Sequence, residues 1–503
     1  MIRFTEENGA LIARSRNETI RIEGWGNNAL RVRTTLLKKL PRDAHALTED
    51  VAHSAKVTIA EGSETAEIVN GKIKATVNGV GIICFYKDNE LILQEYYSYY
   101  YGSIRKEAIC YKIRSREYKG LASDDFKITV RFESDPKEKL FGMGQYQMPI
   151  LDLKGSVLPL EQRNSQVSVP FVVSNKGYGM LWNNPSTGEA AFGTNITKWI
   201  SDESDMVDYW ITADDTPAQI VTNYTECVGR APVMSKDYLG LWQCKLRYRT
   251  PDEVLEVARK YKELGIKLDV IVIDFFHWPH QGDWRFDEKY WSRDAVKAMT
   301  DELHAMGTKV MVSVWPSVDK RSENYYEMEQ KALMSTTDVG SVQTYDYEGD
   351  CGTVDFFNPE AQEFVWGKCK QNYRDWGIDL FWLDNSEPDS TKYDFENYRY
   401  YTGRGSKVGC EYPKKYVEAF YNGQEAEGDH EAVNLCRSAW VGSQKYRTLV
   451  WTGDVQSNFE SFKDQVIAGQ NMGLAGIPWW TTDIGGFMTD NWDDPDFKEL
   501  LIR

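Results

Sequence analysis

The chain has 503 residues, more than one ordinary hydrophobic core can organise, so we expect two or three domains. Its 76 acidic and 59 basic residues give a formal charge of −17, which disfavours nucleic acid and anionic membrane surfaces as partners and favours a neutral ligand. The eight cysteines come no closer than Cys227 and Cys244, 17 residues apart, which excludes C-x-x-C zinc and redox motifs. Charges interrupt the N-terminal apolar residues, and no apolar run approaches the roughly 20 residues of a membrane span. These features predict a cytoplasmic protein without a membrane partner.

Residues 1–232 are predicted to form an antiparallel β-sandwich domain. Short alternating or β-branched runs such as ETIRIEG and FKITVRFES are separated by Gly, Asn and Asp. Runs of this kind are typical of strands that bury one face and are joined by tight turns.

Residues 233–503 change to a repeat of helix, glycine, apolar strand and polar strand end, which predicts a (β/α)8 TIM barrel. Thr250, Pro251 and Glu253 predict a capped helix before the strand LDVIVID. Starting from YLGLWQC, seven strands are almost continuously apolar, as strands buried on both faces should be. The seventh is the last before Arg503, so we expect a barrel that ends before its eighth strand.

Six of these strands end in residues that can carry chemistry. They are Asp274, Trp315, Asp384, Arg437, Asp454 and Asp483. A single Asp after a strand is most often a helix cap or an ion-pair partner, but in a barrel the C-terminal strand ends meet at one rim. Glycoside hydrolysis needs two carboxylates that face each other across a sugar, and Asp384 and Asp454 fit this requirement. The 17 tryptophans, many of them near acidic residues, also suit a carbohydrate ligand, with the filling of a large core as the alternative.

Four motifs occur in one order: WLDNSEPD at 382–389, RSAWVGSQKY at 437–446, WTGDVQSNFES at 451–461 and TTDIGGF at 481–487. From about residue 140 onward the chain thereby resembles glycoside hydrolase family 31. The resemblance implies a retaining, exo-acting hydrolase of terminal α-linked sugars in small oligosaccharides or glycosides. Asp384 matches the family nucleophile and Asp454 the general acid/base. We expect burial beside a second carboxylate to keep Asp454 neutral and the nearby Arg437 to keep Asp384 ionised.

The resemblance also implies a sugar-binding subsite. Asp274 and Arg437 match positions that hydrogen-bond sugar hydroxyls, and Asp483 would support the site. The expected wall of the subsite, for which packing inside the barrel is the alternative, is formed by Trp315, Trp382, Trp451 and Phe487.

Phe275 and Phe276, directly after Asp274, would fill the space beside C5 of the sugar. A filled space favours α-xylosides over α-glucosides, with α-galactosides behind both. His277 and His280 lack a third ligand in register, so we expect no metal site, and no cofactor is required.

Two other functions would use the same residues. A carbohydrate-binding protein without activity would keep the rim as a recognition surface, although the intact Asp384 and Asp454 argue against it. A transglycosylase would let a sugar instead of water attack the intermediate. Self-association is common among members of the family, so the resemblance also makes a homo-oligomer a possible assembly.

Overall fold

The computed structural model describes residues 2–60, 62, 64–97, 113–121, 124–387, 397–489 and 492–503. The chain forms two compact units, and neither is continuous in sequence. Unit 1 comprises residues 1–161, 168–230 and 458–478, and unit 2 comprises residues 162–167, 231–457 and 479–503. The predicted boundary after residue 232 stays a proposal, because each unit also takes a short segment from the other side of it.

The described part of unit 1 is built from three sheets. The first has the order β1-β2-β3-β4-β18-β15-β14-β12, formed by Arg3–Glu7, Ala10–Arg14, Thr19–Gly24, Ala29–Thr35, Val207–Ala213, Tyr178–Trp182, Val167–Ser174 and Leu140–Gln145. The second is antiparallel, in the order β10-β11-β17-β16-β13, formed by Arg116–Gly120, Phe126–Glu133, Ile196–Ser204, Gly188–Phe192 and Val157–Leu160. The third is a meander of β5 to β9, formed by Lys56–Ile59, Thr65–Asn70, Ile73–Asn78, Ile83–Lys87 and Glu90–Gln94.

One hydrophobic core joins these sheets. The alternation in β3 buries Ile20 and Ile22, and that in β11 buries Ile128, Val130 and Phe132. Both sets belong to the same buried cluster as residues of the meander, so the period-2 pattern read from the sequence directs each sheet toward one interior. The predicted sandwich before a barrel is thereby confirmed.

Among its described residues, unit 1 also has two α-helices, α1 (Pro217–Val228) and α8 (Phe459–Leu474). Helix α8 lies between two strands of the other unit in sequence, but it packs on β12, where Asn471 Oδ1 accepts a hydrogen bond of 2.9 Å from the backbone N–H of Gly142. Asn458 caps the helix through the N–H of Ser461.

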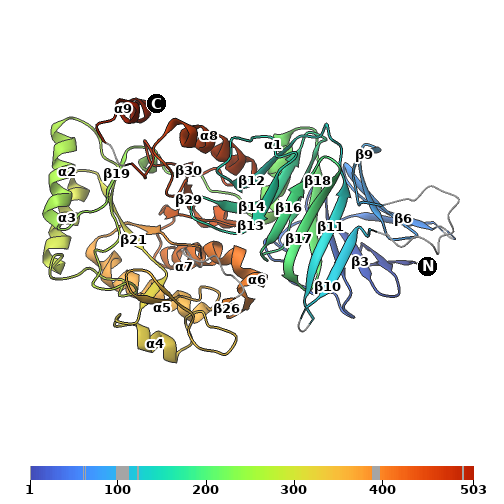
Figure 1. Ribbon diagram of the computed structural model, residues 1–503, viewed down its shortest axis with the longest axis horizontal. Helices are drawn as coiled ribbons and strands as arrows, with labels where there is room; N and C mark the ends of the chain where they lie inside the picture. Colours follow the sequence, from blue (N-terminus) through green and yellow to red (C-terminus); the bar gives the residue numbers. More distant parts are fainter. Residues whose placement is uncertain are drawn as a thin grey trace. The chain divides into compact units, whose positions relative to one another are not determined.

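Unit 2 contains a seven-stranded parallel sheet in sequence order, as predicted for a (β/α) barrel (Figure 1). Its strands are β19 (Trp242–Lys245), β20 (Val270–Ile273), β21 (Lys309–Val314), β25 (Leu380–Leu383), β28 (Asn434–Cys436), β29 (Thr448–Trp451) and β30 (Trp480–Thr481). The remaining described strands form a small sheet and a hairpin: β22 (Ser317–Asp319), β24 (Asp350–Thr353) and β23 (Thr344–Asp346), then β26 (Arg399–Tyr400) and β27 (Gly403–Arg404).

The helices of unit 2 follow its strands. They are α2 (Pro251–Glu263), α3 (Arg293–Ala305), α4 (Tyr325–Gln330), α5 (Pro359–Asn372), α6 (Gly405–Val408), α7 (Tyr412–Ala426) and α9 (Pro495–Ile502). The predicted cap of α2 is confirmed, since Thr250 Oγ1 accepts from the N–H of Glu253, and the Glu253 carboxylate accepts from the N–H of Arg249.

The two faces of the parallel strands enter different clusters. One face packs with the helices, and the other forms an inner cluster of Val270, Val272, Met311, Leu380, Val433 and Leu449, with Trp382 and Leu435 against it. Side chains alternate along a strand, so the next positions in the inner register are Asp274, Trp315, Asp384 and Arg437. Strand periodicity therefore places these four side chains above the apolar interior.

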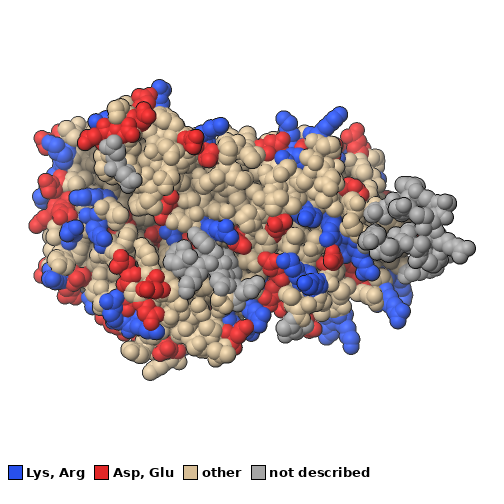
Figure 2. Space-filling model, viewed as in Figure 1, with Lys and Arg blue, Asp and Glu red and all other residues tan. Residues whose placement is uncertain are grey.

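Charged side chains of both signs are interspersed on the face drawn in Figure 2, so no single-sign field dominates it. Within the described ranges, none of the helices combines the length and the apolarity that crossing a bilayer demands.

A buried ion pair fastens the central strands of the first sheet. Arg31 on β4 donates two hydrogen bonds to Asp208 on β18, and their side chains are only 1% and 0% exposed. We expect Asp208→Ala to lower the free energy of unfolding by about 3–5 kcal/mol, because Arg31 would remain as an uncompensated buried charge. The exposed Arg14–Glu7 pair of the same sheet provides the control, since Glu7→Ala should cost less than about 1 kcal/mol. Urea unfolding of both variants would measure this, and similar losses would contradict it.

Candidate active site

Arg437 stands at the end of β28 and contacts three acidic side chains from two segments, those that follow β25 and β29. Its Nη1 lies 3.2 Å from Oδ1 of Asp384 and 3.9 Å from Oδ2 of Asp454. Its Nε and Nη2 reach the Glu387 carboxylate at 2.9 and 2.8 Å, and Nη2 also donates to Asn385 Oδ1 at 2.8 Å. The guanidinium is buried, and the surrounding negative charges raise the pKa of Arg437 further although burial opposes this.

The two predicted catalytic carboxylates lie within reach of one sugar ring. Arg437 Nη1 lies 3.2 Å from Asp384 Oδ1 and 3.9 Å from Asp454 Oδ2. The distance between these two oxygens therefore cannot exceed the sum of these two distances. Carboxyl groups about 5–5.5 Å apart act in retaining glycosidases, and about 6.5–9.5 Å apart in inverting ones. The geometry admits a double displacement between Asp384 and Asp454.

Asp384 follows β25 directly, and one of its two carboxylate oxygens accepts a hydrogen bond from a neighbouring side chain. Trp315 Nε1 donates a hydrogen bond of 3.0 Å to its Oδ2, while its buried Oδ1 has no hydrogen-bond donor and faces Arg437. Burial, and after it the charge of Asp454, raises the pKa of Asp384 to about 6, against the opposing effect of Arg437. The carboxylate is therefore mostly ionised at neutral pH, with one oxygen available to a ligand.

Asp454 departs from the sequence-based expectation of burial. Its side chain is 28% exposed, against 8% for Asp384. Asp454 comes three residues after β29 ends, on a loop, whereas Asp384 leaves its strand directly. Its Oδ2 accepts a hydrogen bond of 2.5 Å from Asn164 Nδ2.

Asp274 ends β20 beside the same group of acids. Burial raises its pKa to about 8, aided by the charges of Asp384, Asp454 and Asp483, although the N–H of Phe275 donates to its Oδ1 at 2.7 Å. Asp274 is therefore largely protonated at neutral pH, so it can donate a hydrogen bond as well as accept one.

Asp483, in the loop after β30, is the fourth aspartate of the site. Burial raises its pKa to about 6, with contributions from Asp454 and Asp384. Even with Asp274 protonated, the remaining carboxyl groups around Arg437 outnumber it, so the site carries excess negative charge. Such a site stabilises a positively charged transition state and repels anionic ligands.

Aromatic rings cover the end of β21. Phe275 stacks on Trp315 with ring centroids 4.9 Å apart, and Phe276 lies 4.5 Å from Phe275. The Arg247 guanidinium lies 4.6 Å above Phe276. Phe276 has φ +61°, a conformation that a bulky side chain adopts only where its surroundings impose it.

The remaining predicted wall residues are unequal in burial. Trp382 on β25 and Trp451 on β29 meet edge to face, with ring centroids 5.4 Å apart. These two strands flank β28, the strand that Arg437 follows. Phe487 is 38% exposed and is fixed by its N–H, which donates to Val455 O in the loop after Asp454. The structure brings the polar site residues to the C-terminal strand ends of unit 2, whereas Trp382 lies inside β25 against the inner cluster and Phe487 lies in the loop after β30. The roles of all these residues stay proposals.

The His277 side chain is buried and its ring nitrogens contact groups of the protein. Its Nδ1 lies 2.9 Å from Asp274 O and its Nε2 lies 2.8 Å from Tyr373 OH, and burial lowers its pKa to about 4. It thereby fixes the strand end that carries Asp274. No group of three or more His, Cys, Asp and Glu side chains within the described ranges is arranged to hold a metal ion.

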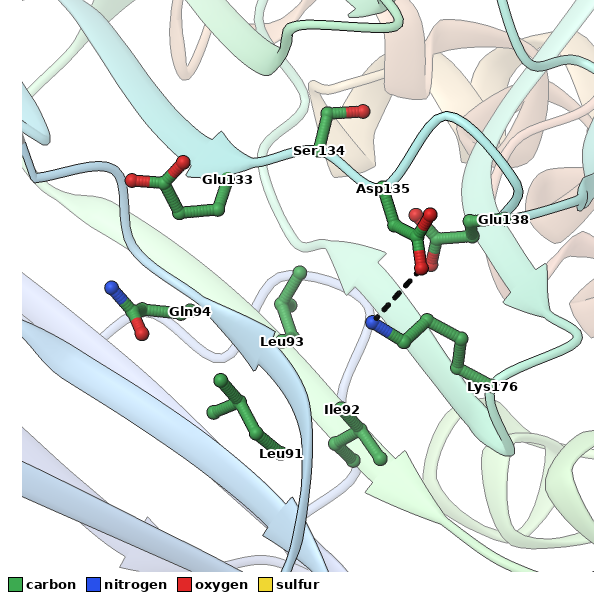
Figure 3. A pocket seen from close by; sticks show the side chains of 9 residues that line it. All are labelled: Leu91, Ile92, Leu93, Gln94, Glu133, Ser134, Asp135, Glu138 and Lys176. Atoms are coloured by element: carbon green, nitrogen blue, oxygen red, sulfur yellow. Dashed lines mark ion pairs between the residues drawn. The ribbon is translucent and has the colours of Figure 1, made fainter.

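Unit 1 has a hollow of about 180 Å³ (Figure 3), lined by Leu91, Ile92, Leu93, Gln94, Glu133, Ser134, Asp135, Glu138 and Lys176. Its Asp135 and Lys176 form an ion pair of 3.9 Å. Glu138 accepts hydrogen bonds from Ser174 on β14 and Tyr178 on β15 and pairs with Lys154. The Glu138 carboxylate therefore serves to join strands.

Sequence reasoning missed four residues of the site. Glu387 lies inside the motif WLDNSEPD, where its acidic type was a usable signal; the last two residues of that motif lie outside the described ranges. Cys244 ends β19, with its Sγ 4.0 Å from Asp274 Oδ2, so it could have been found as a further strand end. Arg247 and Asn164 lie in segments with no such pattern.

Sequence profiles of known families match both parts of the chain. One described as "Glycosyl hydrolases family 31 TIM-barrel domain" matches residues 231–503, and one described as "Glycosyl hydrolase 31 N-terminal galactose mutarotase-like domain" matches residues 19–190.

Two relatives and one solved structure are similar to this chain over most of its length. A protein of Pseudescherichia vulneris named uncharacterized family 31 glucosidase ORF2 is 47% identical over 100% of this chain and 96% of its own length. An α-xylosidase of Saccharolobus solfataricus is 33% identical over 75% of this chain, which spans about half (52%) of that protein. The crystal structure of a family 31 α-xylosidase from a soil metagenome, complexed with xylose, has a TM-score of 0.94 and 46% identity, covering 99% of this chain and 75% of that one.

The raised pKa of Asp274 predicts a stability that depends on pH. An unfolded aspartate loses its proton near its ordinary value of 3.8, while folded Asp274 keeps it to about 8. Between these values the folded state binds more protons, so this residue's contribution to stability falls as pH rises. We expect Asp274→Asn to raise Tm more at pH 8 than at pH 5, by a difference worth roughly 3–4 kcal/mol. Thermal unfolding at both pH values would test this, with exposed Asp301→Asn as the control, and a gain independent of pH would refute it.

Proposed function

The chain belongs to glycoside hydrolase family 31, and on that premise we propose that it is a retaining, exo-acting α-glycosidase that prefers terminal α-xylosides. The observation that supports this most directly is the contact of one buried guanidinium with both Asp384 and Asp454. Two carboxylates of different exposure on one guanidinium suit a neutral ligand better than an anionic one.

In the proposed reaction, Asp384 Oδ1 attacks the anomeric carbon as Asp454 protonates the departing oxygen. The bond to the leaving group breaks, and a β-linked glycosyl ester of Asp384 forms. Asp454, now ionised, then takes a proton from water as that water attacks the same carbon and releases Asp384. Two inversions return the α configuration.

The contacts of Asp384 suit the role of nucleophile. Trp315 occupies Oδ2, which fixes the plane of the carboxylate and leaves Oδ1 for attack. The excess of aspartates would stabilise the oxocarbenium-like transition state, because positive charge develops at the sugar ring.

The preference for xylose rests on the aromatic residues after β20. Phe275 and Phe276 are packed against Trp315 and Arg247, so their rings have little freedom to withdraw for a hydroxymethyl group. The two relatives described above differ in name, one being called a glucosidase and the other an α-xylosidase. An α-glucosidase is therefore the second candidate. Transglycosylation would use the same residues and differ in the acceptor.

Hydrolysis of 4-nitrophenyl α-xyloside, α-glucoside and α-galactoside by the wild type would test the function. We expect the xyloside to give the highest kcat/KM, and Asp384→Ala to lose at least about 10⁴-fold. With azide, Asp454→Ala should form the α-glycosyl azide and Asp384→Ala the β-glycosyl azide, because azide then replaces water or the nucleophile respectively. A wild type no faster than the variants would indicate a binding protein, and a faster glucoside would favour the second candidate.

The pKa of Asp384 predicts the acid side of the pH profile. A nucleophile must be ionised, so kcat/KM should fall as pH drops below about 6. Trp315→Phe removes an N–H donor that favours the ionised carboxylate, and should move this midpoint to higher pH. Initial rates between pH 4 and 9 would measure it. A wild-type midpoint near 4, or one that Trp315→Phe leaves in place, would contradict this explanation.

A further inference from the structure

We propose that Asn164 is a positioning residue for Asp454 and controls its use as acid and base. The inference rests on the proposed function, which assigns those steps to Asp454. Asn164 lies 290 residues upstream, in the segment 162–167 that belongs to unit 2.

Two hydrogen bonds join the residues. Asn164 Nδ2 donates to Asp454 Oδ2 at 2.5 Å, and the backbone N–H of Asp454 donates to Asn164 Oδ1 at 3.1 Å. The second bond fixes which end of the amide is the oxygen, so the first must be a donation to the carboxyl group. One side chain therefore holds both the backbone and the side chain of Asp454.

The segment is itself anchored at the rim. Arg163 and Gln166 exchange two backbone hydrogen bonds of 3.1 and 2.9 Å, which close a turn around Asn164. Gln162 Nε2 donates to Cys410 O at 3.1 Å, and its Oε1 accepts from Ser438 Oγ at 3.0 Å. Ser438 follows Arg437, so the turn is tied to the strand end that carries the guanidinium.

Gly453 permits this close approach. A Cβ at Gly453 would come within 2.7 Å of Asn164 Oδ1 and 2.6 Å of the backbone N of Ser165, and the residue has φ +73°. A side chain at this position would therefore push the turn away from Asp454.

The bonding pattern has a chemical consequence. Because Asn164 occupies Oδ2 of Asp454 as a donor, Oδ1 is the oxygen that can carry a proton to the leaving group. The same bond holds the carboxylate in place for the second step, in which it accepts the proton of water. Without Asn164, a partly exposed side chain on a loop would rotate away from the reacting atoms.

Leaving groups of different basicity test this role. An alkyl α-glycoside needs protonation as it departs, whereas fluoride needs little. With whichever sugar the wild type hydrolyses faster, Asn164→Ala should lower kcat/KM for the methyl α-glycoside about 10- to 100-fold and for the α-glycosyl fluoride about 3-fold or less. Asn372→Ala removes a part-buried amide that bonds only to a backbone oxygen among the contacts described, and it should change neither.

Asn164→Asp is the second variant, and it covers the case in which Asn164→Ala does not fold. It keeps the size and the acceptor for the Asp454 N–H but puts a like charge beside the carboxylate. The alkaline limb of kcat/KM should then move up by about one pH unit, because the repulsion favours the protonated acid. Equal losses for both leaving groups and an unmoved alkaline limb would overturn the role of Asn164. An inactive wild type would instead overturn the proposed function itself.

Discussion

A single buried guanidinium is the contact on which the site depends. Arg437 offsets the desolvation of Asp384 and Glu387, both of which are buried, and it reaches Asp454 as well. Removing one partner of such a cluster leaves charge without compensation, which is why buried ionic groups occur as sets. The sheet order makes the set possible, since β28 lies between the strands that carry the two carboxylates.

Arg437 does not neutralise all the carboxylates around it, and the remaining negative charge suits the proposed reaction. Burial, aided by the charges of neighbouring aspartates, raises the pKa of Asp274, Asp384 and Asp483. The folded chain thus gives up stability at neutral pH to keep negative charge where a cationic transition state would form. The apolar inner cluster below the site, with Val270 and Leu380, supports this arrangement.

Much of this could be predicted from the sequence, and the reasons lie in local regularity. Strand period fixes the inner register, so Asp274, Asp384 and Arg437 could be placed from their spacing alone. Asn164 could not be found, because a turn 290 residues upstream reaches Asp454 only through tertiary folding. The expected burial of Asp454 was wrong for a related reason: burial follows the strand ends, and Asp454 lies beyond one.

Helix α8 has a consequence for how the chain is made. Its packing on β12 belongs to unit 1, although β29 and β30 on either side of it pair within unit 2. A nascent polypeptide therefore emerges from the ribosome with its sandwich lacking a helix until residues 459–474 are synthesised. Unit 1 therefore cannot complete its packing until most of the chain has been synthesised, and the face of β12 that α8 covers stays exposed during that interval.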